Sequence, residues 1–130
     1  MAVTFVEIED RYQPKTKTLP IEAHVTIGDG QNGAYLIFLD QQLKGNNDMA
    51  VLGNAAAVKG KRTIVSATVV DTMDETNWTS LTVTIKEGNN ETVYGPYSKE
   101  VAENLDTVCF IVKILNNAVP ASRSVKIKRK

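Results

Sequence analysis

The sequence is poor in cysteine, histidine and aromatic residues. Its 130 residues include one cysteine, Cys109, and one histidine, His24, and aromatic residues make up 6% of the chain. A single cysteine cannot form an intrachain disulfide, which favours a reducing, cytoplasmic setting. Secretion or surface display after removal of an export signal is the alternative. The zinc patterns CxxC and HExxH are absent, so we expect no metal site of those kinds.

Neither sign of charge is in excess, because 15 basic residues balance 15 acidic ones. Nucleic-acid-binding proteins usually carry a basic excess, so we expect no nucleic-acid partner. The exception is the basic run "KIKRK" at 126–130. We interpret it as a solvated strand edge whose lysines discourage pairing, with contact to an acidic lipid or a nucleic acid as the alternative.

Long apolar runs are also missing. None approaches the roughly 20 residues that a membrane-spanning helix requires. The opening residues "MAVTFVEIED" resemble a strand rather than a signal peptide. The sequence therefore predicts a soluble protein without a transmembrane segment.

Apolar and polar residues alternate with a period of two along most of the chain, which is typical of strands with one buried face. Residues 34–39 ("AYLIFL") differ, because they are apolar at every position and so predict a strand covered on both faces. Only 54–58 and 98–105 have local helix propensity, over one or two turns. The strands that we expect are at 3–9, 21–27, 34–39, 49–53, 63–70, 81–86, 92–98, 106–115 and 124–128.

Turn residues separate these segments, and the connection at 11–20 is long. "EGNN" (87–90) predicts a hairpin turn, because glycine and asparagine tolerate the positive φ that such turns require. Eight or nine short strands predict an all-β fold. We expect a single antiparallel β-sandwich domain over residues 1–130, immunoglobulin-like or jelly-roll, with at most one short helix.

The loop "GDGQNG" at 28–33 matches the dinucleotide-binding pattern GxGxxG by letter. That pattern binds a pyrophosphate only where a strand turns into a helix. Here the following residues predict a strand, so we interpret the loop as a hairpin connection and expect no cofactor.

The loop "DTMDETNW" at 71–78 contains the best ligand-binding candidates, Asp71, Asp74, Glu75 and Trp78. The three carboxylates offer hard oxygen ligands for calcium, but calcium takes six to eight oxygens and the ordered spacing of an EF-hand is missing. Trp78 offers a stacking surface for a sugar. The simpler interpretation is a solvated acidic turn with Trp78 packed on the core.

No catalytic residue can be assigned. His24 falls on the polar face of its strand, and Cys109 falls among apolar residues, where a thiol is usually inert. We expect a non-catalytic binding or structural interaction module that binds a protein partner or self-associates. Its contact regions would be the edge strand at 124–128 and the second apolar faces of 34–39 and of Ile111 and Leu115. The alternatives are a carbohydrate- or calcium-binding module that uses the 71–78 loop and, last, a small hydrolase.

Overall fold

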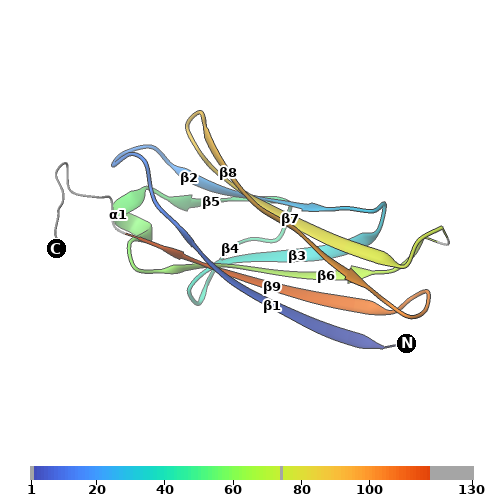
Figure 1. Cartoon of the computed structure of the whole chain (residues 1–130). Coiled ribbons are helices and arrows are strands. Elements are labelled where there is room, and N and C mark those ends of the chain that lie inside the picture. The colour runs from blue at the N-terminus through green and yellow to red at the C-terminus, as the bar shows by residue number, and fades with distance from the viewer. Residues whose placement is uncertain (1, 74, 118–130) are drawn as a thin grey trace, which may run out of the picture.

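Figure 1 presents the computed structural model of the chain, in which residues 2–73 and 75–117 are described. These residues form nine β-strands and one four-residue helix, α1 (Ala55–Val58), so the predicted all-β class is confirmed. The predicted strand at 124–128 and the candidate ligand Asp74 lie outside the described residues. The strands are β1 (Val3–Tyr12), β2 (Ile21–Ile27), β3 (Asn32–Leu39), β4 (Gln42–Gly45), β5 (Met49–Gly53), β6 (Arg62–Val70), β7 (Trp78–Glu87), β8 (Asn90–Glu100) and β9 (Thr107–Asn116).

The strands form two sheets that face each other (Figure 1). The five-stranded sheet has the order β1-β9-β6-β3-β4, and the four-stranded sheet has the order β5-β2-β7-β8. The helix α1 follows β5, and the Asn54 side chain caps it by accepting a hydrogen bond from the Ala57 N–H at 3.1 Å. Within the described ranges, no helix is long and apolar enough to cross a membrane.

Side chains from the inner faces of both sheets form one hydrophobic cluster. Alternation explains it, since every second residue of a strand points to the same face. In β9, for example, Val108, Phe110, Val112 and Ile114 are fully buried, as the sequence predicts. The largest fully buried apolar side chains are Tyr12, Phe110, Ile21, Ile37, Leu52, Leu81, Ile85 and Ile114.

The expectation of purely antiparallel pairing is wrong at one position. Strand β1 pairs in parallel with β9, with Val3 opposite Thr107 and Tyr12 opposite Asn116. The two strands are far apart in the sequence, so no local turn signal reveals their relative direction. The predicted hairpin at 87–90 is confirmed, since β7 and β8 pair across it from Glu87 and Asn90.

The 28–33 loop is not a hairpin connection, because β2 and β3 belong to different sheets. Its glycines have local structural roles instead. Gly30 has a φ of +71°, which favours glycine. At Gly33 a Cβ would lie 2.2 Å from the Thr68 carbonyl oxygen, so only glycine permits this close approach of β3 to β6. A strand does follow the loop, as predicted, and no helix begins there.

Two local predictions are corrected, and one strand was not predicted. Residues 34–39 are not covered on both faces, because Leu36 is 41% exposed. Residues 98–105 contain the end of β8 and a turn rather than a helix. The strand β4 was not predicted, because its four residues begin within a polar stretch and end in glycine, with little alternation.

Candidate interaction surface

The outer face of the five-stranded sheet carries large apolar side chains. Phe5 is 68% exposed on β1, Leu36 is 41% exposed on β3 and Leu43 is 52% exposed on β4. Half-buried apolar side chains lie between them on the same face: Phe38, Ile64, Cys109, Ile111 and Leu115. We call these eight residues the outer apolar surface.

The strand register brings members of this surface together in two groups. Phe38 lies opposite Leu43 of β4 and opposite Ile64 of β6. At the other edge, Phe5 lies opposite Cys109 of β9. Directly opposed side chains on one face are about 5 Å apart and contact each other. Apolar pairs therefore join β4, β3 and β6 on one side and β1 and β9 on the other. Between β6 and β9, every directly opposed pair on this face includes a polar residue, such as Ser66 opposite Ile111.

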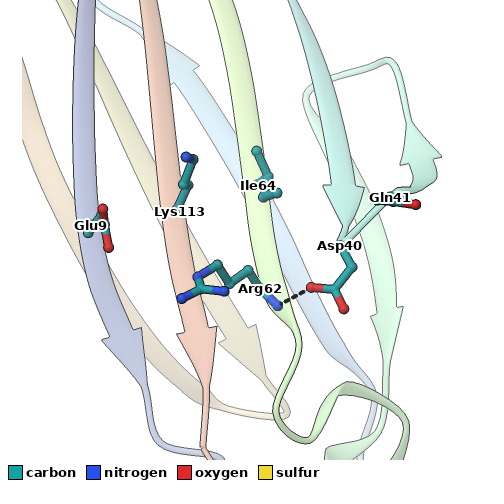
Figure 2. Close-up of a pocket in the computed structure, with 6 residues that line it drawn as sticks. All are labelled: Glu9, Asp40, Gln41, Arg62, Ile64 and Lys113. Atoms are coloured by element: carbon teal, nitrogen blue, oxygen red, sulfur yellow. Dashed lines mark hydrogen bonds between the residues drawn. The ribbon is translucent and has the colours of Figure 1, made fainter.

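A hollow of about 540 Å³ lies on this face, lined by Glu9, Asp40, Gln41, Arg62, Ile64 and Lys113. Figure 2 shows that these side chains come from β1, β9, β6 and the turn after β3. A smaller hollow of about 150 Å³ shares Glu9, Arg62 and Lys113. The hollows thus form one charged depression that overlaps the outer apolar surface at Ile64 and Leu115.

Charges of both signs line this depression. The Arg62 backbone N–H donates a hydrogen bond to Asp40 Oδ1 at 2.8 Å (Figure 2). Lys113 Nζ lies 3.7 Å from Glu7 Oε1. Among the described residues, the Arg62 guanidinium takes part in no ion pair. The sequence does not indicate Arg62 and Asp40, because only the sheet register brings them close to Glu9 and Lys113.

The two described carboxylates of the 71–78 loop, Asp71 and Glu75, do not share a site. Asp71 is fully buried, whereas Glu75 is exposed. The Asp71 Oδ1 atom accepts a hydrogen bond from Gln31 Nε2 at 2.8 Å. Its Oδ2 atom accepts none from the described residues. Those residues contain no group of three or more His, Cys, Asp or Glu side chains able to hold a metal ion.

Gln31 is the centre of a buried hydrogen-bond network that holds this loop. Its Oε1 atom accepts from the backbone N–H groups of Thr72 at 2.7 Å and Met73 at 3.1 Å. Its Nε2 atom donates to the Trp78 carbonyl at 3.0 Å as well as to Asp71. The loop is therefore tied to the 28–33 connection at both of its ends.

The aromatic residues divide into core and surface groups. Tyr12 and Tyr94 are buried, and Tyr35 and Tyr97 pack partly against the core. Burial raises the pKa of the Tyr94 hydroxyl to about 12, and that hydroxyl donates to the Arg11 carbonyl at 2.6 Å. Trp78 is 45% exposed, so its predicted packing on the core is incomplete.

His24 and Cys109 lie in different sheets, so the sheets separate the chain's one histidine from its one cysteine. His24 is on the outer face of β2, with Nε2 2.9 Å from Glu22 Oε1. Cys109 is on the outer face of β9, with Sγ 3.8 Å from Thr68 Oγ1. Its predicted grouping with Ile111 and Leu115 on one face of β9 agrees with the register.

A buried carboxylate, Glu87, fastens the long connection that follows β1. It accepts hydrogen bonds from the Tyr12 hydroxyl at 2.5 Å, the Lys15 N–H at 2.9 Å and the Thr16 N–H at 2.6 Å, and also from the Thr16 hydroxyl. Burial alone would raise the pKa of Glu87, but these donors together hold that pKa below its usual value. This cluster was not predicted from the sequence. The alternation that turns residues 81, 83 and 85 of β7 inward also turns Glu87 inward, and that pattern is the signal that could have indicated a buried carboxylate.

Comparison with known protein families, with curated proteins and with solved structures finds no match to the chain.

Proposed function

We propose that this protein is a non-catalytic interaction module that associates with a second copy of itself through the outer apolar surface. In this proposal residues 1–130 fold as one β-sandwich domain, immunoglobulin-like or jelly-roll, whose two sheets share the core. The observation that carries the proposal is a sheet face, not used by the core, on which each of the five strands presents an exposed or half-buried apolar side chain.

The degree of exposure supports an association surface. Single exposed apolar residues are normal on soluble proteins, whereas contiguous patches mark contacts. Here Phe5, Leu36 and Leu43 are 68%, 41% and 52% exposed on one face. The opposite outer face, on the four-stranded sheet, is mainly threonine and charged residues in its two central strands, and its exposed apolar residues Met49, Val51 and Val93 lie on the two edge strands.

The size of the sheet fits a dimer contact. Five strands about 4.8 Å apart and about eight residues long give a face on the order of 600 Å². Two such faces bury about 1,200 Å² together, at the lower end of the range for specific interfaces. Packed sheets lie about 10 Å apart. The five-stranded sheets of two copies can approach to this distance, because the exposed side chains of one copy can pack on the half-buried side chains of the other.

The charges on this face favour a second copy over a strongly charged partner. Glu7 and Glu9 of β1 are offset by Lys113 of β9 and Arg62 of β6. The whole chain has a formal net charge of zero. Two copies therefore meet without a long-range repulsion, and acids of one copy are available to bases of the other.

Sedimentation velocity over a concentration series tests the proposal. We expect the wild-type protein to shift from monomer to dimer with concentration, and Leu36→Glu to stay monomeric because it places a charge in the contact. Val93→Glu is the matched control, since Val93 is 58% exposed on β8 in the other sheet. A wild-type protein that stays monomeric at millimolar concentration would contradict the proposal, as would an equal loss of dimer in both variants.

The second candidate function is binding of a carbohydrate or calcium at the 71–78 loop, favoured by the exposure of Trp78. An exposed indole can stack on a sugar ring. The test is a melting-temperature series with calcium and with a panel of glycans. A shift that Asp74→Ala or Trp78→Ala abolishes would favour this function over self-association.

A further inference from the structure

The charged depression has an apolar floor between charged side chains. Across β1, β9 and β6, the register places Glu9 opposite Lys113 and Lys113 opposite Ile64. Two residues further along β9, Leu115 lies opposite Arg62 of β6. Ile64 and Leu115 are half-buried, whereas Glu9 and Arg62 are exposed. A molecule in the depression can therefore contact apolar and charged groups at the same time.

Two charges of opposite sign in this depression have no charged partner. Within residues 2–73 and 75–117, neither the Arg62 guanidinium nor the Glu9 carboxylate takes part in an ion pair. Lys113 lies opposite Glu9, but its Nζ atom is 3.7 Å from Glu7 Oε1 instead. Figure 2 shows the Arg62 side chain extending from β6 over β9 toward β1, the strand of Glu9. The two charges thus border the same hollow from different strands.

The charges that line the larger hollow are balanced. Glu9 and Asp40 carry negative charges, and Arg62 and Lys113 carry positive ones. A simple anion would meet repulsion from the two acids, and a simple cation would meet repulsion from the two bases. Asp40 Oδ1 already accepts the Arg62 backbone N–H at 2.8 Å, so Glu9 is the more available acid. The lining therefore favours a ligand that carries both signs of charge.

We propose that the charged depression binds a free α-amino acid with an apolar side chain. The planar guanidinium of Arg62 donates two parallel hydrogen bonds to the ligand carboxylate, a geometry for which arginine is well suited. The ligand ammonium group donates to the Glu9 carboxylate. The ligand side chain packs on Ile64 and Leu115, which removes apolar surface from water. The hollow of about 540 Å³ lies in the size range of small-molecule sites.

This inference goes beyond the proposed self-association, because it assigns a small-molecule ligand to the depression. Ile64 and Leu115 belong to both the depression and the outer apolar surface, so a second copy would cover the site. Binding is therefore measured in the Leu36→Glu variant, since Leu36 lines neither hollow. A protein that fails to self-associate would contradict the proposed function and leave this inference standing.

An NMR titration with leucine tests the proposal. We expect the methyl signals of Ile64 and Leu115 to shift and saturate, while those of Val51 and Val93 on the four-stranded sheet stay fixed. N-acetylleucine lacks the ammonium group, and leucine amide lacks the carboxylate. Each of these analogues should bind at least about tenfold more weakly than leucine, because it loses one charge-assisted contact.

Substitutions assign each contact to a side chain. Arg62→Gln and Glu9→Gln should each weaken leucine binding about tenfold. Arg62→Gln should not weaken the binding of leucine amide further, because that analogue has no carboxylate to lose. Lys99→Gln and Glu91→Gln are the matched controls, since both residues are exposed on β8 of the other sheet. These controls should bind leucine as tightly as the Leu36→Glu variant.

Three results would overturn the proposal. One is the absence of a saturable shift at Ile64 and Leu115 with leucine. Another is binding of N-acetylleucine or inorganic phosphate as tightly as leucine, which would make the depression a site for anions alone. The third is leucine binding that neither Arg62→Gln nor Glu9→Gln weakens, which would place the ligand elsewhere.

Discussion

Replacing Glu87 by glutamine tests how the long connection after β1 is held to the four-stranded sheet. One oxygen of Glu87 accepts the Lys15 N–H, and the other accepts the Thr16 N–H. A glutamine amide must turn its NH₂ group toward one of these donors, and an NH₂ group cannot accept a hydrogen bond. One backbone N–H then loses its partner, and the remaining bonds lose the help of the charge.

The expected cost follows from these contacts. Hydrogen bonds to a charged group contribute about 1.5–3 kcal/mol each, and a buried donor left unpaired costs about 1–3 kcal/mol. Glu87→Gln should therefore lower the free energy of unfolding by about 2–4 kcal/mol at pH 7. Tyr12→Phe removes a single donor and keeps the ring, so it should cost about 1 kcal/mol.

The pH dependence of the free energy of unfolding tests the stabilising role of the Glu87 carboxylate independently. The pKa of Glu87 is lowered in the folded protein from its ordinary value of 4.5. Its stabilising contribution is therefore fully present above pH 4.5 and is lost as the pH falls through the folded pKa. The difference between wild type and Glu87→Gln should shrink below pH 4.5.

Urea unfolding at pH 7 and at several lower pH values measures both effects. Glu91→Gln is the matched control, because the Glu91 side chain is 56% exposed and pairs with Lys86 only at 3.5 Å. That control should change stability by less than about 0.5 kcal/mol. The reasoning would be refuted if the two variants were equally stable, or if the cost of Glu87→Gln did not depend on pH.

Four further substitutions test the loop network and the close strand approach by thermal or urea unfolding. Gln31→Ala should cost about 3 kcal/mol, because it leaves the Thr72 and Met73 N–H groups without their acceptor; no measurable loss would contradict the network. Asp71→Asn keeps the acceptor for Gln31 and removes a buried charge, so stability should be unchanged or higher; a large loss would indicate that the charge is used. Gly33→Ala should cost about 3 kcal/mol through overlap with the Thr68 carbonyl. Gly60→Ala should cost only about 1 kcal/mol, because its φ is +74° but no atom lies within 4 Å of a Cβ there; equal losses at the two glycines would refute the steric argument.

The strands were the most predictable feature of this chain. Alternation with a period of two identified the inward residues of β9 and the core side of β7, because a buried face imposes that period directly. The hairpin at 87–90 was also predictable, since glycine and asparagine in a short turn have a local conformational cause. Such features depend on residues that are close in the sequence.

Apart from the short strand β4, the main misses depend on contacts between distant segments. The sequence could not reveal that β1 lies parallel to β9, or that β2 and β3 belong to different sheets. The charged depression was missed for the same reason, since Glu9, Arg62 and Lys113 meet only through the register of β1, β9 and β6. Asp71 looked like a surface ligand because nothing local indicates that Gln31, forty residues earlier, accompanies it into the interior.

Methyl NMR spectra over a dilution series test the outer apolar surface most directly. If two copies meet through this surface, the methyl signals of Leu36, Leu43, Ile64, Ile111 and Leu115 will move together with concentration. Those of Val51 and Val93, exposed on the four-stranded sheet, will stay fixed. Signals that do not respond to dilution, or that move on the four-stranded sheet instead, would contradict the account.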